Sequence, residues 1–357
     1  MRVSDFNRSK MKKPLKLKPG GRVAAISLSW GGPGTFPHRY QAGKDQFERE
    51  FGLQVVESKH ALRSSEWIAK NPKARADDLM EAFSDPTLDG IISTIGGSDS
   101  VRILPYIDLG VIRDNPKVFM GYSDTTITHL ACFKAGLVSF YGPAFMAGFA
   151  ENGGMFPYMV DSVRRTLFDA APIGLIAPNQ TGWTVEQLGW NDPGNQRRSR
   201  ALNPSTGWRV LQGTGTVSGH LMGGCLEVLE FLKGTDWWPK PECWDNAILF
   251  LETSEEAPSP ALVKRWLRNY GSQGILNRVA GLLIGRPGAS NLPVKDFDQY
   301  DDVVHDVLTG ELGLASLPVI TRMDFGHTDP MFVLPYGVKA TMDCQRCTLA
   351  IDESAVL

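Results

Sequence analysis

The stretch that decides the fold is Val118–Thr126, which reads VFMGYSDTT. Its first three residues are apolar and favour a buried strand, Gly121 permits a sharp turn, and a helix is expected to continue to about Lys134. Open α/β sheets bind their ligands at the carboxyl ends of the strands, where the amides of a first helical turn also point. Ser123 is therefore placed where its hydroxyl could attack a bound substrate.

The sequence on both sides of this stretch alternates short β-branched runs with helical stretches, from about Arg22 to Phe168. Such alternation is typical of βαβ units and of a mainly parallel sheet. Strands are expected at Val23–Ile26, Leu53–Val56 and Gly90–Thr94, and helices at Arg39–Glu50 and Lys73–Phe83. We therefore predict an α/β protein whose residues 1–170 form a doubly wound domain that carries the nucleophile.

Residues 171–215 are rich in Pro, Gly, Asn, Gln and Trp, and they lack helical or strand periodicity. A loop of this length inside a folded protein is usually functional or disordered, and its tryptophans argue against disorder. We expect a linker that covers the substrate, with Trp183, Trp190 and Trp208 as candidate substrate contacts; plain packing is the alternative for each. The basic run Arg197–Arg200 could meet a phosphate, or it could be a solvated loop.

Periodicity returns after Gly215, and residues 216–357 are expected to form a second, β-rich α/β domain. The expected helices are Leu226–Leu232 and Pro260–Tyr270, and the expected strands are Ala247–Leu251, Val279–Ile284, Leu317–Ile320 and Cys347–Ile351. Pro318 would confine its strand to a sheet edge, or else mark the start of the strand.

Composition excludes several classes of protein. The 357 residues are 42% hydrophobic and 21% charged, with 37 Lys and Arg against 39 Asp and Glu, as in an ordinary soluble protein. This balance predicts no nucleic acid polymer and no membrane as a partner, and no apolar signal-peptide core precedes Pro19. Five scattered cysteines favour a reducing compartment, so a cytoplasmic protein is expected. Cys344 and Cys347 have C-x-x-C spacing without a second pair, and we expect neither a metal nor another cofactor.

A serine nucleophile needs a base, and His327 is the strongest candidate among six histidines. It lies in the turn-rich loop Asp324–Pro330, which could present an imidazole at a cleft. Glu252 ends an apolar strand, where a carboxylate is costly unless it has a partner, so it could orient the imidazole. The alternatives are that Ser123 only caps its helix, that His327 is an ordinary surface residue, and that Glu252 is an exposed strand end.

The order Ser, Glu, His matches the α/β-hydrolases, but Thr125 stands where their G-x-S-x-G turn has its second glycine, which disfavours that superfamily. The sequence instead resembles the LD-carboxypeptidase family in the order and approximate spacing of its motifs. These are Ile95-Gly96-Gly97, Arg102-Ile103-Leu104, Asn115-Pro116-Lys117, Gly121–Thr126, Tyr141-Gly142-Pro143, Gly219-x-Leu221-x-Gly223-Gly224, Leu251-Glu252 and Gly326-His327.

The resemblance implies a flavodoxin-like N-terminal domain, a C-terminal domain of the swivelling type and a homodimer. It also implies Ser123, Glu252 and His327 as a catalytic triad, with an oxyanion hole from the amides of Gly97 and Asp124.

Within that family, Gly96–Ser100, the long insert with its tryptophans and Gly285-Arg286-Pro287 resemble the microcin C immunity branch. This resemblance implies a serine carboxypeptidase or amidase that hydrolyses a peptidyl- or aminoacyl-nucleotide. Two alternatives stay open: an LD-carboxypeptidase that trims murein tetrapeptides during wall recycling, and a ligand-binding module that keeps the fold without catalysis.

Overall fold

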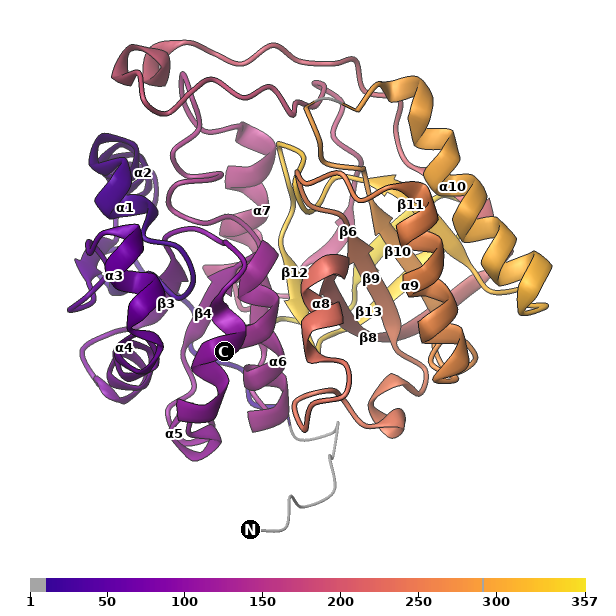
Figure 1. Cartoon of the computed structure of the whole chain (residues 1–357), viewed down its shortest axis with the longest axis horizontal. Coiled ribbons are helices and arrows are strands. Elements are labelled where there is room, and N and C mark those ends of the chain that lie inside the picture. The colour runs from indigo at the N-terminus through magenta and orange to yellow at the C-terminus, as the bar shows by residue number, and fades with distance from the viewer. Residues whose placement is uncertain (1–10, 291) are drawn as a thin grey trace.

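The computed structural model describes residues 11–290 and 292–357, which form two α/β domains side by side, each built on its own sheet (Figure 1). Residues 1–10 of the expected first domain, and Asn291, lie outside the described residues. No helix in the described part of the chain has the length and apolar character that crossing a bilayer requires.

The first sheet has six strands in the order β12-β5-β4-β3-β1-β2. They are β1 (Arg22–Ile26), β2 (Gln54–Glu57), β3 (Gly90–Ser93), β4 (Val118–Gly121), β5 (Ser139–Tyr141) and β12 (Leu334–Tyr336). Strands β1 to β5 pair in parallel in the order 2-1-3-4-5, which is the flavodoxin-like arrangement. The predicted doubly wound sheet is therefore confirmed. The sixth strand, β12, comes from the far end of the chain and pairs antiparallel with β5.

Helices cover both faces of this sheet, so strands β3, β4 and β5 are buried along their whole length. They are α1 (Gly32–Thr35), α2 (Pro37–Phe51), α3 (Ser65–Lys70), α4 (Pro72–Ser84), α5 (Leu109–Asp114), α6 (Thr126–Ala135) and α7 (Pro157–Leu167). Both α2 and α4 begin at a proline, earlier than the predicted helices, because proline is well tolerated in a first helical turn. The helix expected from Ser123 begins with the 3-10 turn η3 (Ser123–Thr125).

The second sheet has eight strands in the order β6-β14-β13-β8-β9-β10-β11-β7. They are β6 (Gly174–Ile176), β7 (Arg209–Gln212), β8 (Thr216–Cys225), β9 (Ile248–Glu252), β10 (Gly281–Gly285), β11 (Val319–Met323), β13 (Lys339–Asp343) and β14 (Thr348–Ile351). Its main helices are α8 (Leu226–Leu232), α9 (Pro260–Ser272) and α10 (Phe297–His305). The expected β-rich second domain is confirmed, and Pro318 immediately precedes the first residue of β11.

Residues 171–215 do more than link the domains. They contribute β6 and β7, the two outermost strands of the second sheet, which the sequence pattern did not predict because strands of three and four residues show too little alternation. Between β6 and β7 the chain includes the 3-10 turn η4 (Pro193–Arg197) and passes across the top of the molecule from one domain to the other (Figure 1).

Cys344 and Cys347 lie at the tight turn between β13 and β14, and both thiols are free. Among the described residues, no three or more His, Cys, Asp or Glu side chains are grouped so that they could hold a metal ion.

Candidate active site

Ser123 lies at the carboxyl end of β4 in a strained backbone conformation. Its φ of 61° is in the left-handed region, which non-glycine residues rarely adopt unless the surrounding structure imposes it. Neither η3 nor α6 has a side-chain hydrogen bond to its N-terminal cap, so Ser123 does not act as a helix cap. The turn instead directs the hydroxyl out of the sheet toward the second domain.

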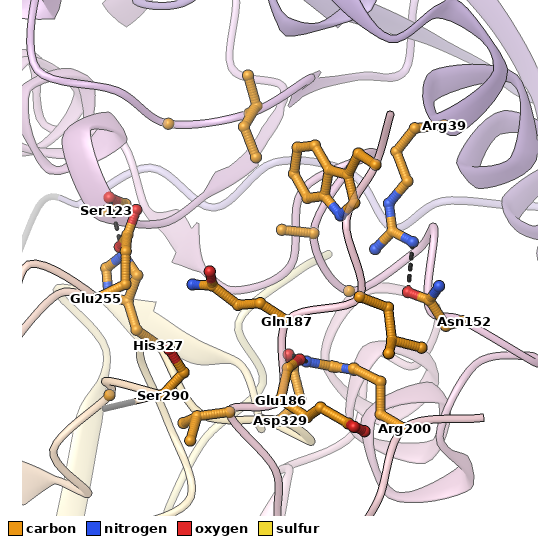
Figure 2. Close-up of a pocket in the computed structure, with 18 of the residues that line it drawn as sticks. Arg39, Ser123, Asn152, Glu186, Gln187, Arg200, Glu255, Ser290, His327 and Asp329 are labelled. Carbon is orange, nitrogen blue, oxygen red and sulfur yellow. Dashed lines mark hydrogen bonds and ion pairs between the residues drawn. The ribbon is translucent and has the colours of Figure 1, made fainter. Parts of the chain in front are cut away.

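The three side chains singled out in the sequence meet in one line of contacts. The Nε2 atom of His327 lies 3.0 Å from the Ser123 hydroxyl, and its Nδ1 atom lies 2.7 Å from Oε2 of Glu252. Figure 2 shows Ser123 and His327 facing each other in the pocket. Glu252 ends β9 and is 1% exposed, so its carboxylate depends on protein partners such as the imidazole. This arrangement allows an imidazole to accept the serine proton.

Tyr141, which the sequence analysis did not single out as a site residue, links the two ends of this line. Its hydroxyl donates to Oε1 of Glu252 at 2.5 Å and accepts from the backbone amide of Ser123 at 3.1 Å. Burial and the Glu252 charge raise the pKa of Tyr141, which keeps the phenol a donor. Its position at the carboxyl end of β5, beside β4, was the signal that could have revealed it.

Close backbone approaches fix the loops that carry these residues. A Cβ atom at Gly326, where φ is 90°, would lie 2.6 Å from the carboxylate oxygen of Glu252. Only glycine therefore lets the chain turn against Glu252 and present His327 one residue later. The loop at Gly96 also lies close to the nucleophile, because a Cβ atom at Gly96 would lie 2.9 Å from the Cβ atom of Ser123.

Asp124 ties the Gly96-Gly97 loop to the turn at Ser123. Its Oδ2 atom accepts the amides of Asp99 at 3.0 Å and Ser100 at 2.8 Å, while its carbonyl accepts the Ser100 hydroxyl. Asp124 therefore lies next to the nucleophile in the same turn and holds the loop that follows Gly97, and Gly97 lines the same pocket as Ser123.

The environment of His327 favours the protonated imidazole. Burial alone would lower its pKa, but the charge and hydrogen bond of Glu252, together with Glu255, raise the pKa of His327 to about 9. Glu255 contacts the ring directly, with its Oε2 atom 3.1 Å from Nε2. The same ring nitrogen therefore faces both a hydroxyl and a second carboxylate.

A pocket of about 450 Å³ opens in front of Ser123 and His327. Figure 2 shows Ser123, His327 and Glu255 together on one side of this pocket, and Arg39 with Asn152 on the other. The two sides differ in charge, because the first carries a carboxylate and the second a guanidinium.

Trp190, one of the three expected tryptophans, lines this pocket. Its ring stacks on Trp30, with centroids 6.3 Å apart and planes inclined by 21°, and the guanidinium carbon of Arg39 lies 4.9 Å from its centroid. Trp30 was not predicted. Its position just after the carboxyl end of β1, where α/β sheets bind ligands, was the available signal.

Trp183 and Trp208 do not line this pocket, and both are buried in the packing that was the alternative to substrate contact. Trp183 is 3% exposed and packs against Phe297 and the guanidinium of Arg286. Trp208 is 8% exposed and donates its indole N–H to Asp324 at 2.7 Å. Both instead anchor the covering segment to the second domain.

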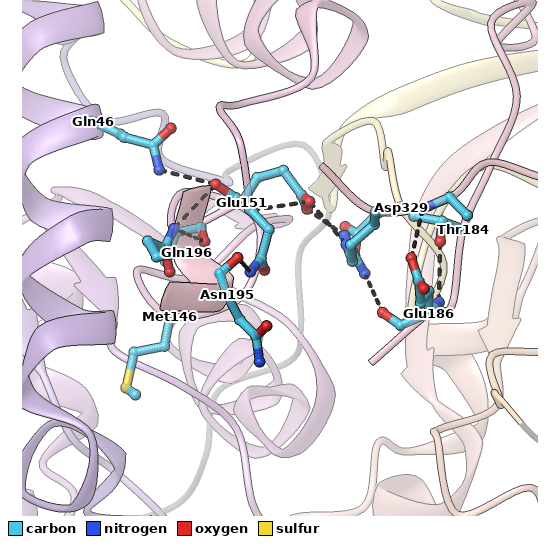
Figure 3. Close-up of polar contacts among 12 residues, drawn as sticks. Gln46, Met146, Glu151, Thr184, Glu186, Asn195, Gln196 and Asp329 are labelled. Atoms are coloured by element: carbon cyan, nitrogen blue, oxygen red, sulfur yellow. Dashed lines mark hydrogen bonds and ion pairs between the residues drawn. The ribbon is translucent and has the colours of Figure 1, made fainter. Parts of the chain in front are cut away.

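The basic run Arg197–Arg200 divides in two. Arg197 and Arg198 are exposed, whereas the Arg200 guanidinium is inserted between the carboxylates of Glu151 and Asp329. Its Nη2 atom lies 2.7 Å from Asp329 and its Nε atom 2.8 Å from Glu151. Figure 3 shows Glu151 and Asp329 among the polar contacts of this region. Arg200 therefore joins the covering segment to both domains, and it does so through an aspartate of the same loop that carries the candidate base.

Comparison with known proteins assigns the family. The sequence model of the LD-carboxypeptidase N-terminal domain matches residues 23–142, and that of the LD-carboxypeptidase C-terminal domain matches residues 218–342. The chain belongs to the LD-carboxypeptidase family. By family it is thus a serine hydrolase.

Similar full-length proteins include two with different roles. The microcin C7 self-immunity protein MccF of Escherichia coli is 29% identical over 350 residues, which covers 94% of each chain. A probable murein peptide carboxypeptidase of Bacillus subtilis is 28% identical over 307 residues, covering 86% of this chain and 85% of the other. Among solved structures, an MccF-like protein from Streptococcus pneumoniae in complex with AMP has a TM-score of 0.85 and 30% identity, covering 94% and 99% of the two chains.

Proposed function

We propose that this protein hydrolyses an amide bond in a peptidyl- or aminoacyl-nucleotide through an acyl-enzyme, with Ser123, His327 and Glu252 as its catalytic triad. The observation that carries the proposal is the placement of His327, whose two ring nitrogens contact the Ser123 hydroxyl and the Glu252 carboxylate. A nucleophile, a base and a group that orients the base are the parts that acyl transfer requires.

In this mechanism the Ser123 oxygen attacks the amide carbonyl while Nε2 of neutral His327 takes the hydroxyl proton. The tetrahedral intermediate collapses, its C–N bond breaks, and the imidazolium gives its proton to the departing amine. Water then attacks the ester in the same way, which releases the acid and restores Ser123. The amides of Gly97 and Asp124 are proposed to bind the oxyanion, and Glu252 stabilises the imidazolium throughout.

Two tryptophans that line the pocket, Trp30 and Trp190, support a nucleotide as the part of the substrate that is joined to the acyl group. Trp30 and Trp190 offer stacked indole faces, on which a nucleobase can pack whatever its identity. The similar Streptococcus pneumoniae protein was solved in complex with AMP, which agrees with a nucleotide as a ligand of this fold.

A murein tetrapeptide is the second candidate substrate, because the chain is also similar to a probable murein peptide carboxypeptidase. Incubation with an aminoacyl-sulfamoyl adenosine and, separately, with a murein tetrapeptide, read by mass spectrometry, decides between them. Cleavage of the nucleotide alone is expected. Release of terminal D-alanine without cleavage of the nucleotide would replace the proposed substrate.

The alternative that the protein binds a ligand without catalysis is tested with a fluorophosphonate probe, which labels only activated serines. The wild-type protein is expected to be labelled at Ser123, and His327→Ala is expected to lose the label. Absence of labelling in both proteins would favour the binding module.

The pH dependence of hydrolysis follows from the raised pKa of His327. The ionisable side chains that face this ring are Glu252, Glu255, Glu227 of α8 and the phenol of Tyr122. Because the base must be neutral and its pKa is raised to about 9, kcat/KM is expected to rise with pH and level off above about 9. A rate profile from pH 6 to 10.5 measures this, with circular dichroism at each pH as a control for folding. A profile that falls between pH 7 and 9 would contradict it.

Removal of the Trp190 ring is expected to weaken nucleotide binding. Trp190→Ala should raise the Kd for AMP roughly tenfold, since stacking on one aromatic ring contributes about 1–3 kcal/mol. Isothermal titration calorimetry measures the change, and Trp208→Ala is the matched control because Trp208 does not line the pocket. Equal affinity of wild type and Trp190→Ala would place the base elsewhere.

The family resemblance also leads us to propose a homodimer that acts in the cytoplasm. Light scattering of the purified protein is expected to give twice the mass of 39.2 kDa of one chain.

A further inference from the structure

Glu255 occupies a position that the mechanism above does not use. Its carboxylate lies 3.1 Å from Nε2 of His327, the nitrogen that also contacts the Ser123 hydroxyl. The side chain is 56% exposed and lines the pocket. It therefore stands beside the place where the scissile carbonyl must lie.

The turn that carries Glu255 is held in place from behind. Oε1 of Glu227, a partly buried residue of α8, accepts both the amide and the hydroxyl of Ser254 at 2.7 Å. The turn closes through a bond from the Ala257 amide to the Ser254 carbonyl at 3.2 Å, and Ala257 has a φ of 51°. Glu255 is thus presented to the pocket by an anchored turn.

In the described part of the chain Glu255 shares its cationic partner, the His327 imidazole, with Glu252, so that two carboxylates face one imidazolium. Within residues 11–290 and 292–357, the His327 imidazole is the one hydrogen-bond or ion-pair partner of its carboxylate. Of the two guanidinium groups that line the pocket, Arg200 is paired with Glu151 and an aspartate, and Arg39 is held by amide and carbonyl oxygens on the other side. The reacting side of the pocket is therefore anionic.

From this polarity we infer that Glu255 selects substrates whose acyl part carries a positive charge beside the scissile carbonyl, either a free α-ammonium or a basic side chain. The inference rests on the proposed function and specifies the acyl group. A cation there would bind the exposed carboxylate. An acidic acyl group would be repelled by Glu255 and, among the described residues that line the pocket, would find the unpaired guanidinium of Arg39 only on the opposite side.

Substrate binding would then also free the base. When the substrate cation attracts Glu255, the carboxylate moves its hydrogen bond from His327 to the ligand, and Nε2 is left to the Ser123 hydroxyl alone. Productive substrates would thereby remove a competitor of the nucleophile.

The test measures binding, so that it does not depend on turnover. The Ser123→Ala protein is titrated by calorimetry with lysyl-, norleucyl-, N-acetylnorleucyl- and glutamyl-sulfamoyl adenosine. Lysyl against norleucyl isolates the side-chain charge, and norleucyl against N-acetylnorleucyl isolates the α-ammonium. At least one of these charges is expected to tighten binding by about fivefold, as for an ion pair half open to water. Among the lysyl, norleucyl and glutamyl compounds, which have a free α-amine, the glutamyl compound is expected to bind most weakly.

The added substitution Glu255→Gln should abolish this preference, and Glu255→Lys should reverse it toward the glutamyl compound. Glu256→Gln is the matched control, because Glu256 is the next residue but does not line the pocket, and it should keep the preference. Equal binding of charged and uncharged acyl groups, no binding at all, or a preference that survives Glu255→Gln would overturn the inference. If the preference is found but the wild-type protein cleaves none of the compounds, the proposed function fails and the inference stands.

Discussion

Ser123→Ala is expected to lower kcat for amide hydrolysis by about 10⁴- to 10⁶-fold, because removal of a triad nucleophile leaves only binding and oxyanion stabilisation. The fold should persist, since the substitution removes a single hydroxyl whose hydrogen bond is made to His327 at the pocket. Single-turnover assays with mass spectrometry measure the rate.

Thermal unfolding of the same variant is the control for folding, with an expected change in Tm of at most about 2 °C, since about 1 kcal/mol gives a shift of this order in a chain of this size. Ser272→Ala, at the end of α9 and outside the pocket, is the matched substitution and should keep full activity. Turnover by Ser123→Ala within tenfold of wild type would show that another group is the nucleophile.

The second large effect is expected from Glu252→Gln, which should reduce kcat by about 10³- to 10⁴-fold with little change in KM. An amide keeps the shape of Glu252, but it has one acceptor oxygen where Tyr141 and His327 both donate. The imidazole would lose its orientation and the charge that stabilises its protonated form.

Tyr141→Phe is the informative comparison for Glu252→Gln. It removes one donor and leaves the carboxylate charge, so its loss should be much smaller, about tenfold, if the charge of Glu252 is what matters. The apparent pKa of the rate profile separates the two variants further: Glu252→Gln should lower it, because Glu252 is the main group that raises the pKa of His327. Equal losses in both variants would instead assign Glu252 a packing role.

The three triad residues could be predicted from the sequence because each lies at or just after the end of a strand. Ser123 follows β4, Glu252 closes β9 and His327 lies in the glycine-containing loop after β11, so local patterns pointed to each. In the structure these three side chains do meet.

Contacts that depend on the order of strands in a sheet could not be predicted from local sequence patterns. Tyr141 reaches Glu252 only because β5 lies beside β4 and faces the second domain, and Glu255 reaches the imidazole only because Glu227 holds the turn after β9. The tryptophans show the same limit. Composition identified an ordered segment, but only the fold decides that Trp190 faces the pocket while Trp183 packs against the second domain.

Strand β12 gives the active site its geometry. It begins at Leu334, a short way along the chain from His327, and it forms hydrogen bonds to β5, in the same sheet whose next strand delivers Ser123. The histidine is thus tethered by the peptide chain to the domain that holds the serine. The C-terminal part of the chain therefore supplies a strand to the sheet of the N-terminal domain. His327 can move away from Ser123 over a large distance only if the hydrogen bonds between β12 and β5 break.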